Sequence, residues 1–147
     1  MSHFNIPIGH GGPLIDAFIT VSAARQSALE AASRSIPDPQ KIRALLDTGA
    51  SHSCLDPVVV TALGIPVTGN CQINTPSSGA APHTVDLYDV GIYIPATNPP
   101  PLVFPTVAVA GCQLFQAQGF HALIGRDILD LCMLFYNGPL KVLTLSF

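Results

Sequence analysis

Two short segments, each an apolar strand that breaks at or just before a glycine, constrain the fold of this chain more than any other feature. The first is Leu45-Leu46-Asp47-Thr48-Gly49-Ala50-Ser51, in which a carboxylate follows continuous apolar residues into a turn. The second lies about seventy-five residues downstream, at Leu123-Ile124-Gly125-Arg126-Asp127-Ile128-Leu129. Asp-Thr-Gly alone is short enough to occur by chance, so its context decides its meaning. Here an apolar strand precedes the motif and the second segment follows it.

The length and composition indicate one domain with an incompletely polar surface. A chain of 147 residues forms a single ordinary domain, residues 1–147, with an extended N-terminal strand and insert over 1–40 and a core over 41–147. Apolar residues make up 48% and charged residues 10%. Because a soluble monomer seldom has so few charges, we expect a partner to cover part of the apolar surface, and self-association is the simplest candidate.

Charge, hydropathy and cysteine spacing exclude several classes of protein. The net charge is −3 and the six Lys and Arg residues are scattered, which argues against a nucleic-acid partner. The N-terminal residues do not resemble a secretory signal, and no apolar run approaches the ~20 residues of a membrane span. Cysteines at 54, 71, 112 and 132 are unevenly spaced, which favours buried thiols in a reducing cytoplasm over a zinc site or a disulfide framework. We therefore expect a cytoplasmic protein.

The pattern along the chain predicts many short strands. Residues 14–21 alternate as a half-buried strand does, and 41–46 form a second strand. Between them, 22–35 fit either a helical turn or a loose hairpin insert. Asp56, Pro57 and Gly64 provide the cap, first position and stop of a short helix.

The second half continues in the same way. Strands are predicted at 71–74 and 84–94, joined by a small, polar hairpin tip at 75–83. Residues 95–101 form a proline-rich loop. Further strands are expected at 102–110, 120–124, 133–136 and 140–147, with a brief helix at 126–131 and a turn at Asn137-Gly138. Many strands with little helix predict an all-β barrel.

From residue 42 to 147, the order and separation of the two motifs resemble the retropepsin-like aspartic proteases. The resemblance implies a small closed acid-protease barrel with one or two short helices and one flap hairpin per subunit. It also implies an aspartic endopeptidase that needs no cofactor and no metal. Its substrate would be a peptide held in extended conformation, and neither nucleic acid nor membrane would be a partner.

The chemistry requires two carboxylates. One group must take a proton from water while the other gives one to the carbonyl oxygen, and two carboxylates that face each other share one proton. The sequence contains a single Asp-Thr-Gly. The second copy must then come from another subunit, so the resemblance implies a homodimer whose two-fold axis runs between two Asp47 side chains.

The family's motif assigns further roles by position. Asp47 is catalytic, Thr48 reaches across the axis to the opposite loop, and Gly49 permits close approach of backbone and substrate. Ala50 matches the retroviral version of the motif, in which no serine hydroxyl supports the aspartate. Ser51 stands where some retroviral members carry an Asp that binds substrate and pairs with the Arg of the second motif.

That substitution leaves the partner of Arg126 open. Asp127 and a carbonyl of the active loop are both candidates, and Arg126 is assigned to support of the dimer. Substrate binding is assigned to Ser51 and to the flap residues, and the terminal strand is expected in the dimer interface. The flap residues are Ser77, Ser78, Gly79 and Ala80, and the terminal interface residues are Leu143, Leu145 and Phe147.

Each assignment has a plainer alternative. Asp47 could cap a turn, 74–83 could be an ordinary surface hairpin, and Gly125 to Asp127 could be a strand-to-helix turn. A Ser-His-Asp relay through His52 is disfavoured, because adjacent residues point apart. His121 is expected to be a partly buried strand residue. Besides the enzyme, the same fold supports a peptide-binding or dimerisation module with little turnover, or a domain that cleaves only its own precursor.

Overall fold

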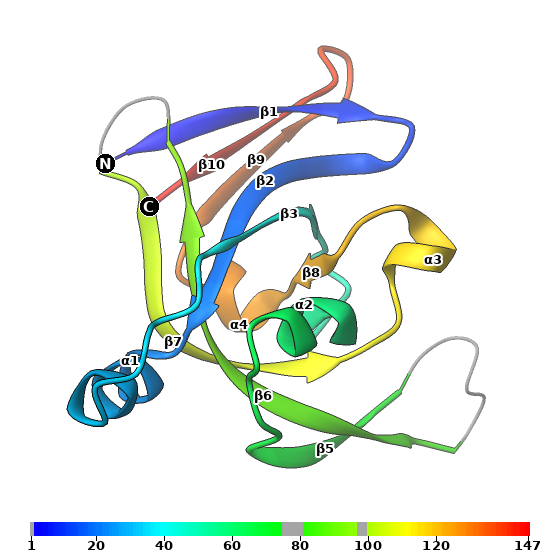
Figure 1. Ribbon diagram of the computed structural model, residues 1–147. Helices are drawn as coiled ribbons and strands as arrows, with labels where there is room; N and C mark the ends of the chain where they lie inside the picture. The colour runs from blue at the N-terminus through cyan, green and yellow to red at the C-terminus, as the bar shows by residue number, and fades with distance from the viewer. Residues whose placement is uncertain (1, 75–80, 97–99) are drawn as a thin grey trace.

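The computed structural model describes residues 2–74, 81–96 and 100–147, and it consists mainly of strands (Figure 1). The all-β prediction is therefore confirmed. The described residues also form four short helices, whereas one or two were expected. The strands are β1 (His3–Gly9), β2 (Gly12–Val21), β3 (Gln40–Leu46), β4 (Cys54–Leu55), β5 (Gly69–Ile73), β6 (His83–Ile94), β7 (Leu102–Gly111), β8 (Ala122–Ile124), β9 (Met133–Asn137) and β10 (Val142–Ser146); the helices are α1 (Ala23–Ala31), α2 (Pro57–Ala62), α3 (Phe115–Gln118) and α4 (Arg126–Leu129).

Six strands close into a barrel. The strands are hydrogen-bonded in the order β5-β6-β7-β4-β8-β3-β2-β1-β10-β9, and a further pairing of β6 with β2 closes the ring. β3 runs parallel to β8 and β4 runs parallel to β7, whereas the other pairs are antiparallel. Closure removes the free edges of these six strands, and it places the ends of β3 and β8 side by side.

Alternation along the strands builds the core. On β2, Ile15, Ala17, Ile19 and Val21 are buried, as their period of two predicts. These side chains belong to one large apolar cluster that fills the barrel. A smaller cluster, built from Cys54, Ala110, Leu114 and Phe120, lies beside it.

The segment before β3 is ordered by the barrel. Of the two alternatives for residues 22–35, the helix is the one observed, as α1. Its Ser22 caps the first turn by accepting a hydrogen bond from the Arg25 N–H at 3.4 Å, and Leu29 is buried in the core. The Arg25 side chain donates to the Gly64 carbonyl at 2.7 Å, which ties α1 to the end of α2.

A second antiparallel layer, made of β1, β10 and β9, lies against the barrel (Figure 1). β10 lies in its middle, with β1 on one side and β9 on the other. The predicted turn between the last two strands is longer than expected. The Leu140 N–H donates to Asn137 Oδ1 at 3.1 Å and Lys141 has a φ of 50°, so β10 begins at Val142 and not at Leu140.

The helix predicted after Asp56 is confirmed. Asp56 is the N-cap and accepts from the Val58 N–H at 3.0 Å, Pro57 occupies the first turn, and Gly64 takes the positive φ of 61° after the helix end. α3 has no counterpart among the predicted elements, because it is a single turn without a side-chain cap. No helix in the described ranges is long and apolar enough to cross a membrane.

Candidate active site

Asp47 lies where β3 leaves the barrel, in a turn that its own backbone closes. The Asp47 N–H donates to the Ile124 carbonyl of β8 at 3.0 Å, and the Ala50 N–H donates to the Asp47 carbonyl at 3.2 Å. The Gly49 N–H donates to Asp47 Oδ1 at 2.8 Å. The half-buried carboxylate is thus held by one of its oxygens at the end of a core strand.

Gly49 is packed closely against this carboxylate. A β-carbon at position 49 would lie 3.1 Å from Asp47 Oδ1, which is tighter than ordinary van der Waals contact. A larger residue would therefore push against the oxygen that its own N–H must hold. The sequence anticipated a close approach at Gly49, and the structure identifies the carboxylate as one of the groups approached.

Arg126 binds the same turn from the other side. Its Nη1 donates to the Thr48 carbonyl at 2.9 Å and its Nη2 to Ser51 Oγ at 3.3 Å. Its backbone N–H also donates to the Ala50 carbonyl at 2.9 Å. Of the partners left open for Arg126, the structure selects the loop carbonyl and adds the Ser51 hydroxyl. The guanidinium therefore connects α4 to the loop that carries Asp47.

Asp127 takes a different partner, Ser53, which the sequence did not single out. The Ser53 N–H donates to Asp127 Oδ2 at 2.8 Å and the Ser53 hydroxyl donates to Asp127 Oδ1 at 2.7 Å. The same hydroxyl accepts from the Gly125 N–H at 3.0 Å, and Ser53 is only 1% exposed. No local pattern could have revealed this pair, because 74 residues separate its members.

Gly125 marks the point where the two motifs cross. A β-carbon there would lie 2.7 Å from the His52 carbonyl carbon, 2.8 Å from the His52 oxygen and 3.0 Å from the Ala50 oxygen. All three atoms belong to backbone, so none can rotate out of the way. The glycine in the second motif is thus explained by the passage of the active loop directly over it.

The comparisons with known proteins agree with this geometry. Residues 34–128, which include both motifs, match a family model described as aspartyl protease. The chain belongs to the aspartyl protease family. No curated protein matches the sequence significantly.

Among solved structures, the chain is similar to a retropepsin-like aspartic protease from Rickettsia conorii, with a TM-score of 0.62 and 17% sequence identity. The match covers 99% of this chain and 91% of that one. At this identity the likeness concerns the fold. This aspartyl protease therefore has the retropepsin-like fold that the two motifs indicated.

β5 and β6 form the antiparallel pair that flanks the predicted flap. The strands are antiparallel, with partners from Gly69↔Leu87 to Ile73↔His83, as the sequence predicted. Ser77, Ser78, Gly79 and Ala80 lie outside the described residues. Their assignment to substrate binding stays a prediction.

The terminal residues expected in a dimer interface have contacts inside their own chain. Leu143 and Leu145 are 4% and 1% exposed and belong to the main core. Phe147 packs edge-to-face on Phe4, with ring centroids 5.8 Å apart. Burial of these side chains therefore needs no second subunit, and a role for them in a dimer stays a prediction.

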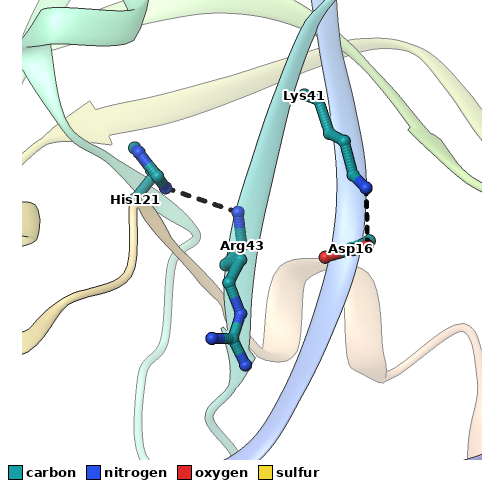
Figure 2. A network of polar contacts seen from close by, with 4 residues as sticks. All are labelled: Asp16, Lys41, Arg43 and His121. Atoms are coloured by element: carbon teal, nitrogen blue, oxygen red, sulfur yellow. Dashed lines mark hydrogen bonds and ion pairs between the residues drawn. The ribbon is translucent and has the colours of Figure 1, made fainter.

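The histidines near the motifs do not join the aspartate. His52 is exposed, and the described residues show no hydrogen bond from its side chain to Asp47 or Ser51, so nothing supports a relay. His121 is half-buried, as expected, but it lies in the bend before β8 and not in the strand. It belongs to a separate polar network (Figure 2). In it, the Arg43 N–H donates to His121 Nδ1 at 3.4 Å, while Lys41 and Asp16 form an exposed ion pair at 2.9 Å. This network is structural and is weakly stabilising at most.

Asp56 is a buried carboxylate that belongs to the framework. Besides capping α2, its Oδ2 accepts from the Leu114 and Phe115 N–H groups at 2.8 and 2.9 Å. Burial alone would raise the pKa of this carboxyl. The hydrogen bonds from Phe115, Val58 and Leu114 outweigh burial, so the pKa of Asp56 lies below its ordinary value of 3.8.

The four cysteines are free, and only Cys54 is fully buried. A side-chain hydrogen bond with Cys112, together with burial, raises the pKa of Cys54. The same interaction lowers the pKa of Cys112 and outweighs burial, which alone would raise it. No group of three or more His, Cys, Asp or Glu side chains in the described parts of the chain is placed to hold a metal ion.

Proposed function

We propose that this aspartyl protease is an endopeptidase that acts as a homodimer, with one Asp47 carboxylate from each subunit at a shared site. The observation that supports it best is the Asp47 turn itself. One carboxylate oxygen accepts from the Gly49 N–H at 2.8 Å, and Arg126 holds the turn at the Thr48 carbonyl. These contacts hold a half-buried carboxylate at the end of a barrel strand, and within the described parts of the chain no cation forms an ion pair with it.

In the proposed reaction, a water molecule lies between the two carboxylates. The ionised Asp47 takes a proton from the water, whose oxygen bonds to the carbonyl carbon of the substrate, while the protonated Asp47 gives its proton to the carbonyl oxygen. When the tetrahedral intermediate collapses, the C–N bond breaks and the leaving amine takes the proton that the first Asp47 received from water. A hydroxyl of the intermediate returns a proton to the second Asp47, so the pair again holds one proton. A single carboxylate cannot fill both roles at once, which is why the proposal requires a second copy.

The substrate is proposed to be a peptide in extended conformation. It would lie between the Asp47 turn and the β5–β6 hairpin and pair with backbone groups as an added strand. Ser51 is one candidate contact, because its side chain is exposed beside the turn and its hydroxyl already accepts from Arg126 at 3.3 Å.

The test compares wild type with Asp47→Asn on a mixed peptide pool across the pH range. The amide has nearly the size of the carboxylate but cannot act as a base, so cleavage should be lost while fold and association persist. Asp38→Asn is the matched control, because it makes the same chemical change on an exposed loop. Cleavage by Asp47→Asn at the wild-type rate would refute the assignment. Peptide binding by wild type without cleavage would favour a binding module.

Mixing subunits tests the need for two copies. When Asp47→Asn subunits are added in excess to wild type, most wild-type subunits pair with an inactive partner. Activity should then fall further than dilution alone explains. A decrease that follows simple dilution would indicate an active monomer and would refute the shared site.

A further inference from the structure

One edge of the sheet is free and apolar. The strand order ends at β9, which pairs with β10 on one side and with no strand of the described residues on the other. Large apolar side chains are exposed along β9 and in the segments that flank it. They are Leu131 (69% exposed), Met133 (64%), Phe135 (67%), Tyr136 (62%) and Leu140 (72%), and we call them the β9 surface.

The β9 surface lacks the features that normally protect a free edge. Between Asp130 and Lys141 the sequence carries no charged residue, and β9 itself, Met133–Asn137, contains no proline. Free edges are usually blunted by lysine, proline or a bulge, because their unpaired N–H and C=O groups otherwise recruit another strand. By contrast β5, at the other end of the sheet, is Gly-Asn-Cys-Gln-Ile and mostly polar.

We propose that the β9 surface binds a second copy of this chain, with the two β9 strands antiparallel about a two-fold axis. The inference rests on the homodimer of the proposed function and identifies its interface. β10, the strand that the sequence suggested, has both edges filled by β1 and β9 within the chain. β5, at the other end of the strand order, also has an open edge, but it is mostly polar. Among the described strands, β9 is therefore the one that combines an open edge with large exposed apolar side chains.

The exposed apolar area of the β9 surface reaches the size range of a specific interface. Taking ~150–250 Å² for a large side chain, the five residues leave roughly 600 Å² exposed per copy at their observed fractions. Complete burial of this area in both copies would remove roughly 1,200 Å², which is the lower limit of the ~1,200–2,000 Å² typical of specific interfaces. Backbone pairing and flanking contacts add to this area.

Charge also favours self-pairing at this surface. The nearest charged residues on either side of β9 in the sequence have opposite signs, Asp130 before it and Lys141 after it, and both are exposed. In an antiparallel pair, the start of one strand lies beside the end of the other, so Asp130 of one copy faces the Lys141 end of the second copy. The apolar centre meets its own copy without like-charge repulsion.

The β9 surface is connected directly to the candidate active site. Only residues 130–132 separate the end of α4 at Leu129 from the start of β9 at Met133. α4 begins with Arg126, whose guanidinium holds the Thr48 carbonyl at 2.9 Å. Association through β9 therefore places the subunit interface next, in the chain, to the helix that supports the Asp47 turn, and the second copy supplies the second carboxylate of the proposed site.

The test uses Phe135→Lys, measured by sedimentation over a range of protein concentrations and by peptide cleavage. Because Phe135 is 67% exposed, the change should leave the subunit folded, and circular dichroism checks this. Val103→Lys is the matched control, an exposed apolar strand residue (50%) on β7. We expect Phe135→Lys to raise the dimer dissociation constant at least ~100-fold and to lose activity in parallel, while Val103→Lys behaves as wild type.

A mixing experiment tests whether β9 pairs with β9 of a second copy. Phe135→Lys and Phe135→Glu subunits should each repel their own copy, whereas the mixture should associate more tightly than either variant alone. No difference between the mixture and the separate variants would overturn the self-pairing of β9. If Phe135→Lys proves unfolded, Met133→Lys, on the same face of β9, replaces it in the same comparison.

The outcomes separate this inference from the proposed function. If Phe135→Lys dimerises as wild type does, the assignment of the dimer interface to the β9 surface is refuted, while the proposed homodimer is unaffected. Dimerisation through β9 by a wild type that cleaves no peptide would uphold the surface and refute the enzyme. A wild type that stays monomeric at every concentration would overturn both.

Discussion

Removal of the Asp127 carboxylate should destabilise the fold although the residue is exposed. In Asp127→Ala, the Ser53 N–H and hydroxyl lose acceptors at 2.8 and 2.7 Å. The Ile128 N–H also loses its contact with Asp127 Oδ1 at 3.0 Å. Since Ser53 is 1% exposed, water can reach its polar groups only after local rearrangement.

The magnitude follows from these contacts. Each hydrogen bond to a charged group contributes ~1.5–3 kcal/mol, so the two bonds to Ser53 contribute ~3–6 kcal/mol before any relaxation. Because the Asp127 side chain has access to solvent, its own desolvation is partial and the net loss should be about 2–4 kcal/mol. With a urea m-value of ~2 kcal/mol/M, the midpoint of unfolding should fall by about 1–2 M.

The assay is equilibrium urea unfolding at one fixed protomer concentration, because a dimer's apparent stability depends on concentration. Asp38→Ala serves as the control, since Asp38 lies on an exposed loop. The double variant Asp127→Ala/Ser53→Ala isolates the pair: its destabilisation should be smaller than the sum of the two single changes. Equal midpoints for Asp127→Ala and Asp38→Ala, or strictly additive effects, would refute the reasoning.

Three further predictions concern the active loop and the framework. Gly125→Ala should abolish activity and lower stability, because its β-carbon would lie 2.7 Å from the His52 backbone; a wild-type melting curve and rate would contradict this. Activity should form a bell against pH, and Ala50→Ser should move its acid limb to lower pH by adding a donor for the ionised aspartate; an unmoved limb would mean that position 50 makes no such contact. The difference in unfolding free energy between wild type and Asp56→Ala should be largest above pH 3.8 and should shrink as the pH falls below this value, since the pKa of Asp56 is lowered in the fold. A difference that does not change with pH would contradict this prediction.

The local features of this protein followed from its sequence. Alternation at Ile15, Ala17, Ile19 and Val21 predicted β2, and Asp56, Pro57 and Gly64 predicted α2, because capping and periodicity act over a few residues. The Asp47 turn was predicted for the same reason, since strand, carboxylate and glycine are adjacent in the chain. These features determined the fold class and the identity of the candidate catalytic residue.

The contacts that support the site could be found only in the tertiary structure. Arg126 selects Thr48 and Ser51 as partners, and Asp127 selects Ser53, across 74 to 78 residues of chain. Sequence supplied the chemical types but not the pairs, since several acceptors were equally available to Arg126. The parallel pairing of β3 with β8 decides among them by bringing the two motifs into contact.

The last strands also show which features the sequence predicts and which depend on the tertiary structure. An apolar, alternating terminal strand was predicted correctly, and its sequence suggested an exposed interface. Whether Leu143 and Leu145 face a second subunit or their own core depends on the neighbours of β10. The N-terminal strand β1 fills one edge of β10 and β9 fills the other, which leaves the free edge on β9. A side-chain pattern can determine which face of a strand is buried, whereas only the assembled sheet determines which edge stays open.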